Sequence, residues 1–378
     1  MNRIRAAVVG VGHLGRFHAE KLARSEAVRL VGVVDPVEAR RLHVAAECQT
    51  QPFPDHRSLA GQIDAAVIAA PTRLHHPIAL ELLERGIHLL VEKPLAATAA
   101  EADDLVKAAR RRKLVLRVGH VERFNPALET LRADLADPKY IEALRAGPFS
   151  FRSTDIGVVL DLMIHDLDLV LSLVHSRVRK IDALGLSVLG GHEDVANARL
   201  EFDSGCVAVL SASRVSCQAV RRMHVWTLRA FAAVDFAARS STLVRPDSTL
   251  LDRRFDLDCF APEDAKQKER LLEALLPREE RHSEPVDALL LELNDFLDSV
   301  RQCSAAAPGC ASPACSGEQG RDAVALAERI LAKIAAHAWD DQPDGLVGPL
   351  ATARPSVLPS PRWQLDRGRS RRPHREAG

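Results

Sequence analysis

The feature that most constrains the fold is a glycine-rich loop that joins a short apolar run to an amphipathic stretch. Residues 4–9 form the apolar run, Gly10-Val11-Gly12-His13-Leu14-Gly15 forms the loop, and apolar residues then recur at helical spacing. A strand, a glycine turn and a helix in this order make the arrangement that binds dinucleotides. The loop therefore predicts a nucleotide-binding unit of strand, helix and strand.

The loop residues have separate expected tasks. Gly10 permits the tight turn, Gly12 lets the backbone approach a pyrophosphate, and Gly15 lets helix and strand pack closely. His13 and Leu14 stand at the helix start, where free N–H groups and the helix dipole favour the phosphates. All five residues are predicted to contact the cofactor.

Apolar runs and helix-like stretches alternate up to about residue 120, and this pattern predicts a doubly wound parallel sheet. The strands are expected to be buried on both faces, because the runs are continuous and show no alternation. The further runs span residues 28–34, 65–70, 88–91 and 114–118, and the helices are expected at 75–85 and from Thr98, with Glu101 completing a capping box.

Asp35 directly follows the apolar run 28–34, about twenty positions beyond the last glycine of the loop. A carboxylate there accepts hydrogen bonds from both ribose hydroxyls and repels a 2′-phosphate, so NAD is the expected cofactor. Arg40 and Arg41 leave NADP open as the less favoured alternative.

Composition excludes several classes of partner. The 378 residues are 47% hydrophobic and 27% charged, which is ordinary for a protein with two cores, and Lys+Arg and Asp+Glu balance at 51 each. No overall charge favours nucleic acid or an anionic membrane, and no apolar stretch can span a bilayer. Together with a strand pattern that follows the first residues directly, this predicts a cytoplasmic protein without membrane insertion.

The seven cysteines are interpreted as reduced thiols. Cys303, Cys310 and Cys315 cluster, but their spacing is not that of zinc ligands, so we interpret them as loop residues and expect no metal site.

After about residue 120 the pattern changes to alternating segments. Residues 198–202 and 206–210 flank the turn 203–205 and predict a hairpin, and similar runs across 177–255 predict a large, mainly antiparallel open sheet. The predicted fold class is α/β, a Rossmann-type doubly wound parallel sheet followed by a C-terminal α+β domain. The expected helices are 158–174, 285–300 and 320–337, and the expected divisions are 1–120 for the cofactor, 121–338 for substrate and oligomer contacts, and a disordered Pro/Arg-rich tail at 339–378.

Two short motifs carry chemistry. Lys93 stands between Glu92 and Pro94 at the end of the fourth apolar run, where it can act as an acid or base, although the tripeptide alone is compatible with a solvated turn. Asp161 and His165 lie four residues apart on one face of a predicted helix, and a carboxylate with an imidazole suits proton handling. By themselves they are equally explained as a capping aspartate and a structural histidine.

In this order and at these separations, the glycine loop, Glu92-Lys93-Pro94 and Asp161-x-x-x-His165 resemble the Gfo/Idh/MocA oxidoreductase family over about residues 4–337. The resemblance implies a dehydrogenase with a Rossmann domain and a second domain whose open sheet forms homo-oligomer contacts. It implies that Lys93 faces the nicotinamide and that Asp161 and His165 face the reacting hydroxyl.

The similarity also takes in Ala70-Pro71-Thr72 with His75, which implies cofactor contacts for Pro71, Thr72 and His75. Glu92 is expected beside the cofactor site, as a structural anion whose side chain points away from the cofactor. The Lys93–Pro94 peptide that follows is expected to be cis. His120 and Arg123 are secondary candidates for cofactor or interdomain contacts.

Within the family, residues 118–126, 154–166 and 196–200 are most similar to bacterial UDP-N-acetylglucosamine 3-dehydrogenases associated with lipid A synthesis. The expected reaction is oxidation of the sugar 3-hydroxyl to a ketone, with Arg152, Lys180 and Arg214 available for a nucleotide. A dehydrogenase of a free cyclitol or hexose and a non-catalytic NAD-binding sensor remain the alternatives.

His165 is the first choice for the general base, because an unperturbed imidazole has a pKa of about 6.5. Lys93 is the rival base; otherwise its ammonium holds the hydroxyl and stabilises alkoxide charge.

Overall fold

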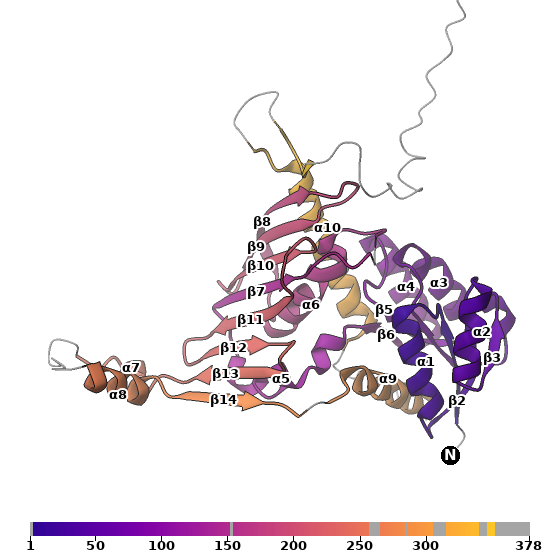
Figure 1. Ribbon diagram of the computed structural model, residues 1–378, viewed down its shortest axis with the longest axis horizontal. Helices are drawn as coiled ribbons and strands as arrows, with labels where there is room; N and C mark the ends of the chain where they lie inside the picture. Colours follow the sequence, from indigo (N-terminus) through magenta and orange to yellow (C-terminus); the bar gives the residue numbers. More distant parts are fainter. Residues whose placement is uncertain are drawn as a thin grey trace, which may run out of the picture.

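Two β-sheets form the body of the molecule, and helices lie between and around them (Figure 1). The computed structural model describes residues 3–151, 154–256, 265–284, 286–304, 315–339 and 346–351. The predicted fold class, a Rossmann-type parallel sheet with a mainly antiparallel second sheet, is confirmed.

The first sheet has six parallel strands in the order β3-β2-β1-β4-β5-β6. Its strands are β1 Ile4–Val9, β2 Val28–Val34, β3 Gln51–Phe53, β4 Ala65–Ile68, β5 His88–Glu92 and β6 Leu116–Gly119. The helices are α1 His13–Arg24, α2 Glu38–Glu47, α3 His75–Glu84 and α4 Ala99–Arg112, with short turns η1 His56–Leu59 and η2 Thr72–Leu74. The strand order reverses between β1 and β4, which is the switch point at which such sheets bind ligands.

The apolar runs become these strands because their side chains are buried on both faces of the sheet. The predicted ends differ from the observed ones by up to two residues. The short edge strand β3 was not predicted, because three residues that include Pro52 give no clear strand signal. Thr98 caps α4 as expected, while the Glu101 carboxylate accepts from the backbone N–H of Ala97, one residue before the cap.

The second sheet has nine strands in the order β14-β13-β12-β11-β7-β10-β9-β8-β15. They are β7 Tyr140–Ala146, β8 Val178–Ser187, β9 Val195–Phe202, β10 Val207–Ser213, β11 Val220–Trp226, β12 Phe231–Asp235, β13 Ser240–Val244, β14 Arg278–His282 and β15 Leu350–Ala351. The predicted hairpin is β9 and β10, and Gly205 takes a positive φ of 83° in its turn. β7 pairs in parallel with β10, an arrangement that local alternation does not indicate.

The remaining helices range from single turns to a helix of 20 residues. They are η3 Val121–Phe124, α5 Pro126–Glu129, η4 Arg132–Leu135, the π-helix η5 Val159–Met163, α6 Ile164–Leu173, α7 Ser248–Leu251, α8 Ala265–Leu275, α9 Ala288–Ser304 and α10 Gly317–Ala336. α6 and α10 cover one face of the second sheet with a single apolar core, and α7 and α8 project on an arm beside β14 (Figure 1). The predicted helix 158–174 is interrupted by the π-helical turn.

α9 departs from a simple division of the chain at residue 120. Leu293, Phe296 and Leu297 of α9 are buried in the core of the first sheet, against α1. Cys303 belongs to α9 and so is not a loop residue, while Cys315 is buried just before α10 and Cys310 lies outside the described residues.

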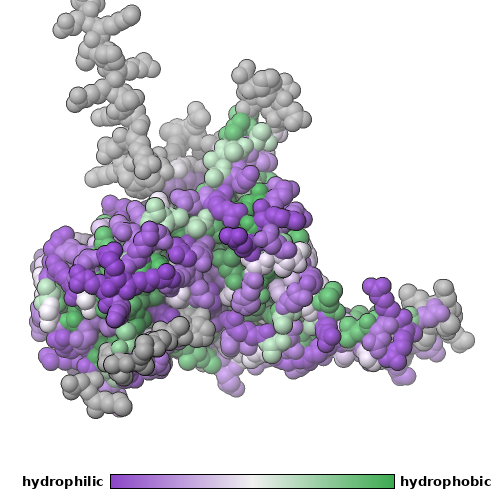
Figure 2. Space-filling model, turned by 180° about the vertical axis from the view of Figure 1, so that it is seen from behind, coloured by the Kyte–Doolittle hydropathy of each residue, from purple (hydrophilic) through white to green (hydrophobic). Residues whose placement is uncertain are grey.

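The predicted disordered tail is partly wrong, because Leu350–Ala351 adds β15 to β8 and Ala338 pairs with Val347. Residues 340–345 and 352–378 lie outside the described part of the chain. Within the described ranges, no helix combines the length and apolar character needed to cross a membrane. Seen from behind, the surface is mostly polar, with apolar side chains near the foot of the arm (Figure 2).

Candidate active site

A cleft of about 910 Å³ lies at the carboxyl ends of the parallel strands. Val9, Val34 and Glu92, which end β1, β2 and β5, all border it. Ligands bind at this edge in open α/β sheets. Residues that follow the parallel sheet also line the cleft: Phe151, Thr154, Asp155, Ile156 and Asp161.

The glycine loop forms one wall of the cleft. Gly10 has φ +85°, and a Cβ there would lie 2.7 Å from the backbone nitrogen of Ala70. A Cβ on Gly15 would lie 1.8 Å from the Gly10 carbonyl oxygen, so only glycine lets α1 pack this close to the loop. Gly12 has nothing within 4 Å of a Cβ position and borders the cleft. The loop thus leaves room for a phosphate beside the start of α1.

The start of α1 is free to receive an anion. Gly12 is its N-cap and offers no capping side chain, and no acidic residue lies in its first turn. His13 and Leu14 both line the cleft at this helix end, as the sequence predicts. The residues present therefore fit a dinucleotide pyrophosphate.

Asp35 is buried at the end of β2 and lines the same cleft. Its carboxylate accepts hydrogen bonds from the backbone N–H groups of Val11 at 3.1 Å and Val37 at 2.9 Å. Arg40 contributes an ion pair at 3.2 Å from Nη1 to Oδ2. Asp35 thus links the glycine loop to the second strand and keeps a cation beside the position expected for the ribose.

The turn after β4 has both exposed and buried members. Pro71 and Thr72, the predicted cofactor contacts, line the cleft. His75 is buried behind the cleft wall, with Nδ1 2.8 Å from the carbonyl oxygen of Pro94 and Nε2 2.8 Å from that of Ala70. Burial lowers the pKa of His75. The neutral imidazole has a single N–H, so it donates to one of these two carbonyl oxygens at a time.

Lys93 and Asp161 meet in the cleft, although they are separated by 68 positions. The Lys93–Pro94 peptide is cis, as expected. Lys93 Nζ donates to the Asp161 backbone oxygen at 2.7 Å and to Oδ1 at 2.9 Å, with both side chains less than one-fifth exposed. The π-helical turn carries Asp161, and such turns often occur at functional sites.

His165 lies on the first turn of α6 and is half-buried, but it does not line the cleft wall. Its Nδ1 has no hydrogen-bond partner among the described residues. Burial, and then the neighbouring cations Lys93 and Arg145, hold the pKa of His165 well below its ordinary value. The imidazole is therefore neutral at neutral pH. The buried ring of His120 lies edge-on to it, with centroids 6.4 Å apart.

Two further predicted residues are structural in their contacts. Arg123 is buried and binds Asp168 at 2.6 Å, away from the cleft lining. Asp166, in the first turn of α6, is buried against Arg145 at 2.8 Å, and Arg145 also binds Glu122. Both ion pairs anchor α6, the helix that continues from the π-helical turn.

Several cleft residues were missed in the sequence. Arg73 follows the predicted Pro71-Thr72 pair and is exposed at the cleft, while Asp155 has a buried Oδ2 without a partner among the described residues. Isolated polar residues in loops give no periodic signal that would identify them. The expected nucleotide cations do not line the cleft: Lys180 pairs with Asp182 on β8, Arg214 is buried against Asp194, and Arg152 lies outside the described residues.

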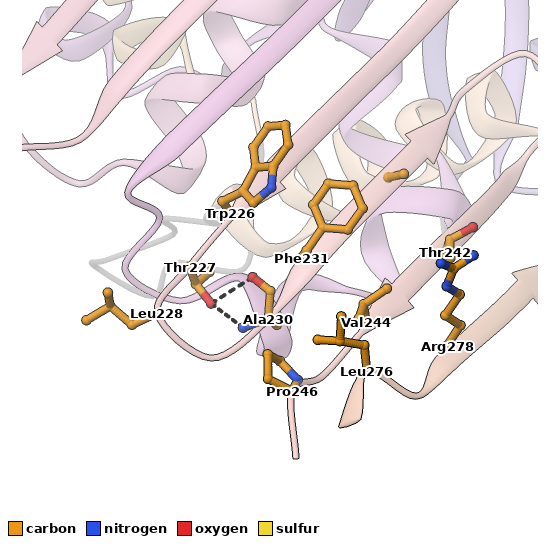
Figure 3. A pocket seen from close by; sticks show the side chains of 11 residues that line it. Trp226, Thr227, Leu228, Ala230, Phe231, Thr242, Val244, Pro246, Leu276 and Arg278 are labelled. Carbon is orange, nitrogen blue, oxygen red and sulfur yellow. Dashed lines mark hydrogen bonds between the residues drawn. The ribbon is translucent and has the colours of Figure 1, made fainter. Parts of the chain in front are cut away.

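A second hollow, of about 540 Å³, lies on the open face of the second sheet beside the arm (Figure 3). Trp226, Phe231, Val244 and Leu276 line it, and Arg278 is the charged side chain of its lining. Trp226 stacks at 4.9 Å from Phe231 and 5.1 Å from Tyr140, measured between ring centroids. This hollow is apolar and lacks the paired titratable groups of the cleft.

A parallel sheet with a dinucleotide loop, and a π-helical turn from the second domain that places Asp161 against Lys93, define an NAD(P)-binding oxidoreductase. The chain belongs to the GFO/IDH/MocA oxidoreductase family. The NAD-binding Rossmann profile of that family matches residues 4–120, and its C-terminal domain profile matches residues 129–229.

Named relatives are dehydrogenases. The chain is 42% identical over 237 residues to a UDP-N-acetylglucosamine 3-dehydrogenase of Acidithiobacillus ferrooxidans, covering 62% of this chain and 75% of the relative. It is 29% identical to an NAD⁺-dependent scyllo-inositol 2-dehydrogenase of Bacillus subtilis, covering 57% of this chain and 68% of the relative. A solved structure of the Acidithiobacillus ferrooxidans enzyme superposes with a TM-score of 0.75 at 35% identity, covering 88% of this chain and 98% of that one.

Proposed function

We propose that this protein oxidises the 3-hydroxyl of UDP-N-acetylglucosamine to a ketone with NAD⁺ as the hydride acceptor. The observation that carries the proposal is the contact between Lys93 and Asp161 in the cleft, because it places a cation from the parallel sheet and a carboxylate from the π-helical turn in the same cleft as the glycine loop. The 42% identity to a dehydrogenase of that nucleotide sugar supports the choice of substrate.

The cofactor would be held by the glycine loop and its neighbours. Gly12 and the first residues of α1 take the pyrophosphate, and Pro71 and Thr72 border the nicotinamide end. Asp35 favours NAD over NADP because its buried carboxylate faces the ribose hydroxyls and opposes a 2′-phosphate, although Arg40 offsets part of its charge. When bound, the nicotinamide supplies the acceptor for the hydride.

The proton is handled by three residues. We assign His165 as the base. It does not line the cleft wall, but it lies near enough to Lys93 for that cation to lower the pKa of the imidazole, and the neutral ring can take the hydroxyl proton while hydride leaves the same carbon. Lys93, held by Asp161, donates to the reacting oxygen and stabilises the developing alkoxide. The overall balance is alcohol plus NAD⁺ to ketone, NADH and one proton.

The nucleotide end of the substrate needs cationic groups. Arg40 and Arg73 are both exposed on the cleft wall, and Arg40 pairs with Asp35, so we assign Arg73 to the diphosphate. Asp155 offers a carboxylate to substrate hydroxyl or amide donors at the same wall.

The open face of the second sheet suits contact with a second copy of the chain. Tyr140, Trp226 and Phe231 form a partly exposed aromatic group beside the hollow of Figure 3, and large apolar patches mark interaction surfaces. We propose a homo-oligomer through this face, with residues 1–120 as the cofactor unit and 121–338 as the substrate and assembly unit. Free thiols such as Cys217 suit a reducing cytoplasm.

The test is NADH formation by the full chain with a panel of UDP-sugars, free hexoses and inositols. The proposal expects the highest kcat/KM with UDP-N-acetylglucosamine. Faster turnover of a free inositol would establish the cyclitol reaction instead, and NAD binding without turnover of any substrate would favour a sensor.

A further inference from the structure

A buried cluster of titratable side chains lies behind the cleft, where α1, β5 and α9 meet. It consists of His18 at 0% exposure, Glu92 at 7% and Glu292 at 2%. One nitrogen or oxygen of each lies within 4.8 Å of the others, and His18 Nε2 is 2.7 Å from Glu92 Oε1. Among the described residues, these three side chains form a cluster that is compact enough to hold a common ion or proton.

Glu292 is the unusual member. Neither of its carboxyl oxygens has a hydrogen-bond partner among the described residues. Its charged neighbours are carboxylates: Glu92 on β5, Asp168 on α6 and Asp295 on its own helix, of which Asp295 faces Arg117 on β6 at 3.6 Å. An isolated ionised carboxylate in such a site is very costly, so the group must be neutralised.

Glu92 has the opposite environment. His18 on α1 and Lys93 lower the pKa of Glu92 against the effect of burial, with His75 on α3 adding a smaller contribution. Burial and the three neighbouring carboxylates raise the pKa of Glu292 well above its ordinary value. When the surroundings of two nearby carboxyl groups shift their pKa values in opposite directions, the pair holds one proton.

A divalent cation is the other way to neutralise the cluster. A histidine that binds a metal normally donates its second ring nitrogen to an acceptor, which fixes the tautomer. His18 Nδ1 is buried and has no partner among the described residues, while Nε2 is engaged by Glu92. The contacts therefore favour a proton over a metal.

We propose that Glu92 and Glu292 together hold one proton, which resides on Glu292, and that this pair, with His18, positions Lys93 and holds a single negative charge, that of Glu92, behind it. Glu92 Oε2 accepts from the Lys93 backbone N–H at 3.3 Å. A Cβ on Gly119 would lie 2.9 Å from the same oxygen, so the Glu92 side chain is packed in place. α9 thus supplies, from late in the chain, the group that completes the back of the active site.

The shared proton can be tested without any substrate. Infrared difference spectroscopy of the full chain compares the parent with Glu292→Gln, and Glu129→Gln on exposed α5 is the matched control. The proposal expects the C=O stretching band of a buried carboxylic acid to be lost in Glu292→Gln and retained in Glu129→Gln. An unchanged band in Glu292→Gln overturns it, as does a tightly bound metal that elemental analysis finds in the parent and not in this variant.

Folding provides a second check. If Glu292 is protonated, a neutral side chain can replace it without loss of charge. Both Glu292→Gln and Glu292→Leu should therefore fold, and failure of both variants to fold would overturn the proposal.

The positioning role rests on the proposed function and is tested by the pH dependence of kcat/KM. Glu92→Gln removes the charge behind Lys93 and should move the acid limb to lower pH by on the order of one unit. Glu292→Gln removes no charge and should leave the limb in place. Equal shifts of the acid limb in both variants would show that both carboxyl groups are ionised and would overturn the proposal. Absence of turnover in the parent would overturn the proposed function instead. In that case the infrared result still decides whether the pair holds one proton.

Discussion

Replacing Lys93 by methionine separates chemistry from cofactor binding. Lys93 Nζ makes two hydrogen bonds to Asp161, at 2.7 and 2.9 Å, and its side chain is 13% exposed. Lys93→Met keeps the length of the side chain but removes the charge and leaves the Asp161 carboxylate unpaired. We expect a stability loss of about 1–3 kcal/mol from that unpaired group.

The loss of activity should be much larger. A positioned group that assists proton transfer or stabilises the oxyanion typically contributes about 10²–10⁴-fold, which corresponds to roughly 2.7–5.4 kcal/mol of barrier. We therefore expect kcat/KM for UDP-N-acetylglucosamine to fall by about 10²–10⁴-fold, while NAD⁺ binds within a few-fold of the parent because the glycine loop and Asp35 are untouched.

The assay is NADH formation by stopped flow, with NAD⁺ affinity measured by calorimetry. Lys107→Met on the surface of α4 is the control, since Lys107 also pairs with an aspartate but is 68% exposed. Turnover within tenfold of the parent, or loss of NAD⁺ binding with chemistry preserved in the bound fraction, would refute the assignment of Lys93.

Four further outcomes are expected. Asp35→Ala should weaken NAD⁺ by about 10- to 100-fold and NADP⁺ much less, because it removes hydrogen bonds to ribose hydroxyls and relieves repulsion of a 2′-phosphate; equal losses in titrations of both would sink the ribose role. Since the pKa of His165 is lowered well below its ordinary value, kcat/KM should hold as pH falls through about 6.5 and decline only in more acid solution. Between the ordinary pKa of histidine and the lowered pKa of His165, the unfolded chain binds a proton that the folded chain does not, so His165 makes unfolding easier as pH falls. His165→Asn should therefore reduce the pH dependence of the melting temperature. Trp226→Glu on the open sheet should reduce the mass of the oligomer in light scattering without changing NAD⁺ affinity, and an unchanged mass would contradict the assembly face.

The first half of the site follows closely from the sequence. Gly10 is explained by its positive φ and Gly15 by the close approach of the Gly10 carbonyl oxygen, while Gly12 leaves open space at the cleft. Asp35 lies at a strand end that a continuous apolar run identifies. Each of these features depends on one short segment of the chain, so tertiary contacts do not alter the prediction. Only the family resemblance indicated that Lys93 and Asp161 belong to one site, and their direct contact was not predicted, because nothing local indicates that two residues so far apart in the chain will meet.

The parts that were missed depend on tertiary context. Asp161 and His165 were expected on one α-helical face, but a π-helical turn places Asp161 alone on the cleft wall and leaves its carbonyl to Lys93. Glu292 gave a signal that was overlooked, since it is a charged residue beside Leu293 on the buried stripe of α9, where Phe296 follows one turn later. A charge on an apolar helix face predicts a buried partner, although the sequence does not identify which one.

The most direct test of the central claim uses UDP-N-acetylglucosamine that carries deuterium at carbon 3. If Lys93, Asp161 and His165 direct oxidation of the 3-hydroxyl in the cleft, the deuterium should appear on the reduced cofactor and turnover should show a primary isotope effect. NADH that contains only protium, or transfer from another carbon of the sugar, would contradict the account.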